Sequence, residues 1–274
     1  PIMGCGLVDS TLTSQLPELL SRVYWGYMRQ SLHWSLESMG GPKLASIGLT
    51  TYNKDVYEPS EDSFALVDAV AASLTAITQP APALCVEVGG GSGYVICSLA
   101  LMLAEAGYSP HCLVTDLSSN ATAACQQTLV SHSVQNIDVI RVDLILALLP
   151  RLKGNVDVLL FNPPYVPTPE EEVPTSQSAY DATGCQVNAA WAGGDRGRQV
   201  IDRLLPLVPE ILSPSGHFFL VTVLENAPEG EHLPSPVSPL LWKFASPTQC
   251  RQLTPLSTAA VTRYAGWLWH SMWL

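Results

Sequence analysis

The chain is most constrained by a regular alternation of short apolar runs with longer helical segments between residues 50 and 226. Apolar runs of this length, each followed by a segment long enough for a crossover helix, are typical of buried parallel strands. The pattern predicts strands at 84–88, 111–115, 137–142, 156–161 and 217–223, and helices at 60–74, 94–106, 120–131 and 198–212. It therefore predicts a doubly wound α/β fold, a mainly parallel twisted sheet with helices on both faces.

The same pattern divides the chain into three parts. Residues 51–226 form the predicted α/β domain, and residues 1–50 are a predicted helical extension whose role the sequence does not indicate. Residues 227–274 are rich in Pro and Ser and then in Trp, and we find no strand–turn–strand pattern in them. Two prolines should bend the last helix of the domain. The segment 213–216 should then turn into the fifth strand.

Composition argues against several kinds of protein. The formal net charge is −11 and the 13 Lys and Arg residues are scattered, whereas proteins that bind nucleic acids gather basic residues on one face. No apolar run reaches the roughly 18 residues of a membrane span. The seven Cys residues form no C-x-x-C pair, which indicates reduced thiols in a cytosolic or nuclear protein. The six His residues are dispersed, so no metal site is predicted.

The ends of the first two predicted strands carry residues suited to a nucleoside ligand. In an open α/β sheet, ligands bind beyond the carboxyl ends of the strands. The first strand ends in Glu87, followed by a turn with Gly89, Gly91 and Gly93, and the second ends at Asp116, where a carboxylate can hold ribose hydroxyls. The G-x-G-x-G spacing with a preceding acid differs from the dinucleotide-binding turn. It favours S-adenosylmethionine, whose sulfonium replaces the pyrophosphate.

The third predicted strand ends in Asp143 and Leu144. These residues are placed to meet the amino group of an adenine and to cover its face. The alternative interpretation is that Asp143 caps a helix formed by the apolar run 144–149. The sequence by itself leaves both interpretations open.

The fourth predicted strand ends in Asn162-Pro163-Pro164-Tyr165, the motif most indicative of function. Each Pro fixes its own φ and restricts the preceding residue, so the Asn side chain is held rigidly at the sheet edge. The Asn amide oxygen and a Pro carbonyl can both accept hydrogen bonds from one planar –NH₂ group. Tyr165 can pack against that group. The motif therefore predicts methylation of a planar amide or amine nitrogen, catalysed by positioning.

With these motifs, the chain resembles the HemK family of protein glutamine N5-methyltransferases, and most closely its eukaryotic and archaeal branch. The resemblance implies a Rossmann-like class I methyltransferase fold. The segments that carry it are 55–64, 87–93, 115–116, 142–144, 161–166, 190–194 and 220–226. The residues it implies as contacts of S-adenosylmethionine are Ser63, Glu87, Gly89, Asp116, Asp143, Leu144 and Asn162. We add Gly91 and Gly93 to that predicted cofactor site.

The resemblance also implies partners. The Asn-Pro-Pro-Tyr motif is expected to hold the glutamine amide in the Gly-Gly-Gln motif of a class 1 peptide-chain release factor, and protein lysine is a second implied acceptor. A small zinc-binding activator subunit is expected to form a heterodimer with the chain by extending the sheet beyond its third strand, at 137–142. One of Val139 and Ile140 is expected to face outward at this edge, so that Lys there removes the partner and leaves the domain folded. Residues 227–274 do not resemble the two further strands with which that family closes its sheet.

Two other functions remain open at the level of sequence. A nucleic-acid adenine N6-methyltransferase would use the same motif on a flipped base, but the acidic charge and the lack of a basic stretch count against it. A binding protein that kept the fold and lost activity is the other alternative. The intact residues from Asn162 to Tyr165 count against that interpretation.

Overall fold

The computed structural model describes residues 42–50, 55–174, 180, 190–226 and 240–244. The chain divides into two units, Pro1–Lys43 and Leu44–Leu274, and everything discussed below lies in the second. The predicted helical extension lies almost entirely outside the described residues, as does most of the predicted irregular tail. None of the helices in the described ranges has the length and hydropathy of a membrane span.

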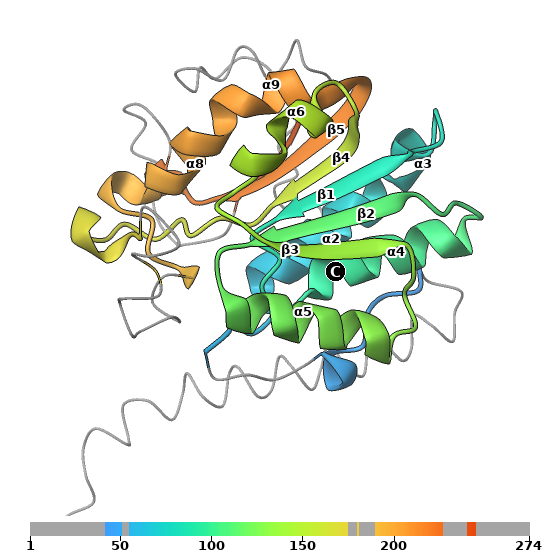
Figure 1. Ribbon diagram of the computed structural model, residues 1–274, viewed down its shortest axis with the longest axis horizontal. Coiled ribbons are helices and arrows are strands. Elements are labelled where there is room, and N and C mark those ends of the chain that lie inside the picture. Colours follow the sequence, from blue (N-terminus) through green and yellow to red (C-terminus); the bar gives the residue numbers. More distant parts are fainter. Residues whose placement is uncertain (1–41, 51–54, 175–179, 181–189, 227–239, 245–274) are drawn as a thin grey trace, which may run out of the picture. The chain divides into compact units, whose positions relative to one another are not determined.

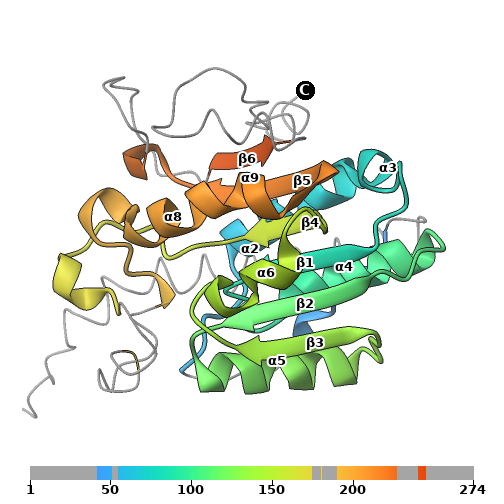
Figure 2. The same cartoon turned by 45° about the horizontal axis from the view of Figure 1, so that its top comes forward.

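A six-stranded sheet forms the centre of the described structure, with strand order β3-β2-β1-β4-β5-β6 (Figures 1 and 2). The strands are β1 Leu84–Val88, β2 His111–Asp116, β3 Ile137–Arg141, β4 Val156–Phe161, β5 Leu212–Thr222 and β6 Leu240–Phe244. Neighbouring strands from β3 to β5 are parallel, and β6 is antiparallel to β5. The predicted α/β fold is confirmed, and the bounds of β1 and β4 are those predicted.

Helices cover both faces of this sheet (Figures 1 and 2). The α-helices are α2 Glu61–Ala72, α3 Leu74–Ile77, α4 Tyr94–Glu105, α5 Ser119–Ser131, α6 Leu149–Leu152, α8 Gln199–Leu204 and α9 Val208–Ile211. The 3₁₀ helices are η1 Ile47–Leu49, η2 Leu146–Leu148, η3 Glu170–Glu172, η5 Asp195–Gly197, η6 Leu205–Leu207 and η7 Leu224–Asn226. Residues of α2, α4 and α5 pack into one hydrophobic core, and those of α6, α8 and α9 into a second on the opposite face.

The segment after Arg198 follows the prediction in part. It is helical as far as Ile211, and η6 interrupts it at Pro206, which cannot donate the backbone hydrogen bond of a continuous helix; Pro209 lies in the first turn of α9. The turn predicted at 213–216 is wrong. These residues belong to β5, and the register shift between Val156 and Val158 of β4 accommodates them as an irregularity in the ladder.

The tail also departs from the prediction at one place. Residues 240–244 form β6, although the sequence pattern indicated no strand there. An antiparallel strand needs no crossover helix, so a pattern of strands alternating with helices does not predict a strand such as β6. The sheet therefore continues by one strand past the predicted α/β domain.

Candidate active site

The carboxyl ends of β1, β2 and β4 lie side by side at one edge of the sheet. Val88, the last residue of β1, is paired with Thr115 of β2 and with Phe161 of β4. The strand order also reverses between β1 and β4, because β2 and β3 extend the sheet on one side and β5 on the other. Ligands of open α/β sheets bind at such a reversal point. The structure thus brings the predicted residues after these strands to one place.

The glycine turn after β1 leaves open space at two positions and is tightly packed at a third. Gly89 and Gly91 have φ of +67° and +52°, and a side chain built on either would meet nothing within 4 Å. At Gly93, by contrast, a Cβ atom would lie 2.7 Å from the sulfur of Cys125. Gly93 therefore allows α4 and α5 to approach each other, whereas Gly89 and Gly91 form a cradle open to a ligand.

Glu87 lies beneath this turn and is 2% exposed. Its Oε2 accepts a hydrogen bond of 3.0 Å from the backbone N–H of Ile96 in the first turn of α4. Burial raises the pKa of this carboxyl group well above its usual range, and the bond from Ile96 opposes that shift only in part. Glu87 thus joins β1 to α4, and its contact with the cofactor stays a prediction.

Asp116 at the end of β2 connects the second strand to the glycine turn. Its Oδ2 accepts a 2.9 Å hydrogen bond from the N–H of Gly91, and its Oδ1 accepts one of 2.8 Å from the N–H of Ser118. Burial raises the pKa of Asp116, while these backbone N–H groups and the charge of Arg141 act in the opposite direction. The carboxylate is therefore held rigidly beside the open cradle, where the prediction places the ribose.

Asp143 follows β3 and has a partner that the sequence did not indicate. A terminal nitrogen of Arg203, on α8, lies 2.5 Å from Asp143 Oδ2. The next residue, Leu144, is 8% exposed and has a φ of +50°, a left-handed conformation that is uncommon outside glycine. The ion pair and this backbone conformation fix the direction of the Asp143 carboxylate. Its contact with an adenine remains a prediction, and the helical turn η2 begins only at Leu146.

Asn162, directly after β4, presents an unpaired acceptor. Its side-chain Oδ1 is buried and has no hydrogen-bond partner in the part of the chain that the structure describes. A buried polar atom without a partner costs about 1–3 kcal/mol, so such atoms are few in folded proteins and each needs an explanation. This oxygen is at the position where the sequence predicts that an –NH₂ group is held.

Tyr165 is fixed at its hydroxyl by a buried carboxylate. The hydroxyls of Tyr165 and Tyr57 each donate a 3.1 Å hydrogen bond to Oδ2 of Asp62, which is 4% exposed. The N–H of Ser63 donates to the other carboxylate oxygen of Asp62. Burial, and then the charge of Asp62, raise the pKa of Tyr165, which therefore stays a neutral phenol. The segment before α2 and the Asn-Pro-Pro-Tyr motif thus meet at one side chain.

Ser63 takes part in the start of α2. Its Oγ accepts from the N–H of Ser60 at 3.4 Å in a capping box, and it donates to Asp62 at 3.2 Å. The side chain is 5% exposed. The Ser63 hydroxyl is therefore hydrogen-bonded to residues at the start of α2. Its contact with the cofactor stays a prediction.

Sequence reasoning assigned no role to several residues that complete the site. Asp62, Tyr57 and Asn226 lie inside segments that carry the family resemblance, and that was their only signal. No sequence signal pointed to Arg203, because an arginine on the surface of an amphipathic helix is common. No group of three or more side chains that could hold a metal ion occurs among the described residues.

A parallel sheet with its ligand cradle at the reversal point and an Asn-Pro-Pro-Tyr motif beside it places the chain among the class I N-methyltransferases, which use S-adenosylmethionine. No family model matches the chain. Methyltransferase HEMK2 of Mus musculus is 46% identical over 64% of this chain and 75% of its own length. The eRF1 methyltransferase catalytic subunit mtq2 of Schizosaccharomyces pombe is 35% identical over 63% of this chain and 74% of its own length. The release factor glutamine methyltransferase of Mycobacterium tuberculosis is 30% identical over 55% of this chain and 47% of its own length. The chain belongs to the HemK family.

The described residues fit S-adenosylmethionine as the methyl donor. The open space at Gly89 and Gly91 admits a ligand close to the backbone, and Asp116 lies beside it with its carboxylate oriented by the turn. When bound, the cofactor supplies an electrophilic methyl carbon on a sulfonium. The unpaired Oδ1 of Asn162 follows β4, the strand next to β1, so the residues predicted to bind the acceptor and the cofactor share one edge of the sheet.

Proposed function

We propose that the chain methylates the side-chain amide nitrogen (N5) of the glutamine in the Gly-Gly-Gln motif of a class 1 peptide-chain release factor. The observation that carries this proposal is the buried, unpaired Oδ1 of Asn162. A planar –NH₂ group is the donor that suits an acceptor fixed at the sheet edge. The names of two relatives support the substrate, since one is an eRF1 methyltransferase and the other a release factor glutamine methyltransferase.

The chemistry that we propose depends on positioning. An amide nitrogen is a poor nucleophile because its lone pair is delocalised into the carbonyl, so the reaction gains most from a fixed approach to the methyl carbon. Asn162 Oδ1 accepts one N–H of the glutamine amide and orients the nitrogen. As the new N–C bond forms, the S–CH₃ bond of the donor breaks to leave a neutral thioether, and the nitrogen gives up one proton to water. Tyr165 keeps its ring in place because its hydroxyl donates to Asp62, and the ring face can stabilise positive charge that develops on the nitrogen.

The proposal is tested by incubating the purified chain, alone and with an activator subunit, with S-adenosylmethionine labelled on the methyl group. The acceptors are a class 1 release factor, the same factor with its Gly-Gly-Gln glutamine replaced by Ala, histones and double-stranded DNA. We expect label on the intact release factor only, at the glutamine. Label on lysine or on DNA, with none on the release factor, would contradict the proposed substrate.

We also propose that a small zinc-binding activator subunit pairs with the chain at β3. The strand is an edge of the described sheet, and an unpaired edge exposes backbone groups that can pair with a second chain. Just beyond it, Leu146 is 44% exposed. The Schizosaccharomyces pombe relative is named a catalytic subunit, which supports a further subunit in that enzyme.

The structure corrects one expectation about this edge. We expected one of Val139 and Ile140 to face outward, so that Lys at that position would remove the partner and leave the domain folded. Both side chains are partly buried, Val139 against one core and Ile140 against the other. Successive side chains of a strand point to opposite faces of the sheet, and helices cover both faces here. In this proposal the partner therefore pairs with the main chain of β3 and contacts exposed side chains near it, such as Leu146 and Asp138.

The chain alone is therefore expected to aggregate, and co-expression with the activator should keep it in solution. Leu146→Lys should lower the yield of co-purified activator at least tenfold while the melting temperature of the domain stays within a few degrees. Leu49→Lys is the matched control, since Leu49 is 51% exposed and lies in η1, outside the sheet. For both variants, size-exclusion chromatography measures the yield of co-purified activator, and thermal unfolding measures the melting temperature. A monomeric chain that is fully active without any partner would contradict the proposed dependence.

A further inference from the structure

Asn226 joins three segments around the Asn-Pro-Pro-Tyr motif. It ends η7, just after β5, and is 1% exposed. Its side-chain Nδ2 donates to the carbonyl of Tyr165 at 2.8 Å and to the carbonyl of Arg196 at 2.7 Å, and its Oδ1 accepts from the N–H of Val223 at 2.8 Å. Both N–H groups of the Asn226 side-chain amide thus donate to carbonyls of other segments of the chain. A buried side chain with this many bonds fixes the position of each group that it contacts.

The loop at 193–197 leaves no room for the motif to move. A Cβ atom on Gly193 would lie 2.6 Å from the carbonyl oxygen of Pro164, and one on Gly197 would overlap the carbonyl oxygen of Tyr165. Gly197 has a φ of +67° and Arg196 one of +52°, which is a strained conformation for a residue with a side chain. The backbone of this loop therefore packs directly against the backbone of Pro164 and Tyr165.

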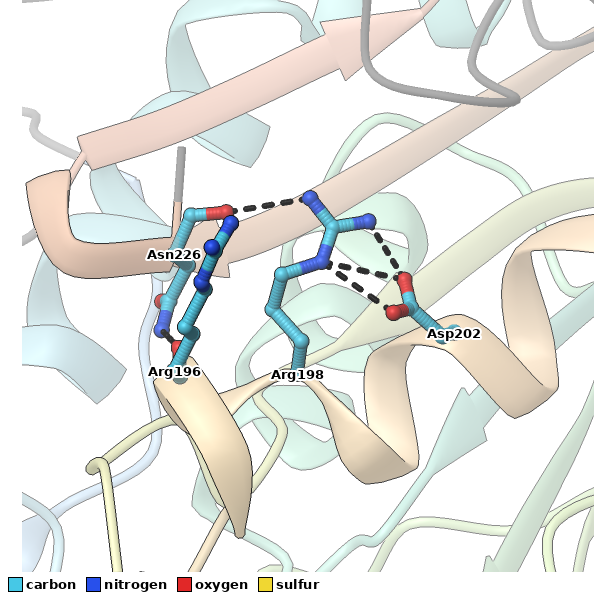
Figure 3. Close-up of polar contacts among 4 residues, drawn as sticks. All are labelled: Arg196, Arg198, Asp202 and Asn226. Atoms are coloured by element: carbon cyan, nitrogen blue, oxygen red, sulfur yellow. Dashed lines mark hydrogen bonds and ion pairs between the residues drawn. The ribbon is translucent and has the colours of Figure 1, made fainter. Parts of the chain in front are cut away.

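Asn226 is itself held by Arg198, whose side chain lies between Asn226 and Asp202 (Figure 3). Nη1 of Arg198 donates to its main-chain carbonyl at 3.1 Å. The Nε of Arg198 donates to both carboxylate oxygens of Asp202, one turn further along α8. The Arg198 side chain is 13% exposed and that of Asp202 is 52% exposed. Arg198 thus connects the end of β5 to the start of α8 and limits the movement of Asn226.

We propose that Asn226 is a positioning residue for methyl transfer, acting through the main chain of Tyr165. Pro163 and Pro164 each have a fixed φ, which leaves fewer backbone rotations to absorb a displacement of the Tyr165 carbonyl before it reaches Asn162. The hydroxyl of Tyr165 is already bound by Asp62, and Asn226 fixes the other end of the same residue. This inference rests on the proposed function only in taking Asn162 as the group that orients the acceptor nitrogen.

A merely structural role is the alternative, in which Asn226 closes the end of β5 through Val223 and affects stability alone. Asn226→Ala separates the two. We expect kcat to fall on the order of 10- to 100-fold, the loss that a small misplacement of reacting groups produces. The Kd for S-adenosylmethionine should change less than about threefold, because no predicted cofactor residue contacts Asn226. A kcat within twofold of wild type would overturn the inference.

Amide hydrogen exchange gives a second readout that needs no methyl acceptor. In the segment 162–168, the N–H of Val166 donates to the carbonyl of Trp191 and the N–H of Thr168 to that of Gly194. In Asn226→Ala these amides should exchange at least tenfold faster, while the amides of β1 and β4 keep their wild-type rates. Unchanged exchange in 162–168 overturns the inference even if wild-type enzyme proves inactive on the release factor. Wild-type inactivity alone would instead count against the proposed substrate.

A glycine pair keeps the test decisive if Asn226→Ala does not fold. Gly197→Ala places a methyl group against the Tyr165 carbonyl, and Gly154→Ala is its matched control. Gly154 has a φ of +70°, close to the +67° of Gly197, but a side chain there meets nothing within 4 Å. Both variants carry the same kind of backbone strain, so the difference in kcat between them reports displacement of the motif. We expect a loss of at least tenfold for Gly197→Ala relative to Gly154→Ala, and equal rates would overturn the inference.

Discussion

Asn162→Ala should lower the rate of methyl transfer on the order of 100-fold or more, because loss of a rigid positioning contact commonly has that effect. The affinity for S-adenosylmethionine should fall much less, since the predicted cofactor site also includes Asp116, Asp143 and the glycine turn. Single-turnover rates with the release factor, together with calorimetric titration of the cofactor, measure the two effects separately. Activity within a few-fold of wild type would remove Asn162 from the proposed mechanism.

The structure adds an expectation about the stability of this variant. Oδ1 of Asn162 has no partner among the described residues, so its removal relieves an unsatisfied buried acceptor. The melting temperature of Asn162→Ala should therefore equal or exceed that of wild type. Asn155→Ala is the control at the opposite end of β4. Asn155 is exposed and its Nδ2 donates to the carbonyls of Arg151 and Lys153, so this change should leave the rate of methyl transfer intact.

The part of the fold that sequence predicts well is the part whose strands are buried between helices. Such strands are short and mostly apolar, which is why β1 and β4 have the predicted bounds. The prediction failed where that logic does not apply. In β5 the residues 213–216 have the composition of a turn yet continue the strand, and β6 is antiparallel to β5, so the pattern of parallel strands did not predict it.

The candidate site was predictable to a similar extent. The residues after β1, β2 and β4 could be placed together because parallel strands end at one edge of a sheet. Their fixing partners could not, because these come from distant segments. Tyr165 and Asp62 are 103 positions apart, and Asn226 and Tyr165 are 61 apart. Strand alternation does not determine the strand order or which helix ends meet, so these pairs appear only in the folded structure.

Asp116→Ala should weaken binding of S-adenosylmethionine by about 1.5–3 kcal/mol, the value of charge-assisted hydrogen bonds such as those from a carboxylate to ribose hydroxyls. The structure indicates a second contribution in the same direction. Asp116 also accepts from the N–H groups of Gly91 and Ser118, so its loss leaves the glycine turn without one of its fixed contacts. Asp116→Asn keeps one acceptor oxygen and removes the charge, and its loss of affinity should be intermediate.

Calorimetric titration with S-adenosylmethionine measures the cofactor affinity of wild type and of the two Asp116 variants. Asp138→Ala is the control. Asp138 lies on the neighbouring strand β3, and its side chain is 67% exposed and paired with His111. Removing that exposed carboxylate should change the cofactor affinity less than twofold, since surface ion pairs contribute at most about 1 kcal/mol even to folding. Unchanged affinity in Asp116→Ala would mean that the ribose is not held at the end of β2. The cradle at Gly89 and Gly91 would then have to bind a different part of the cofactor.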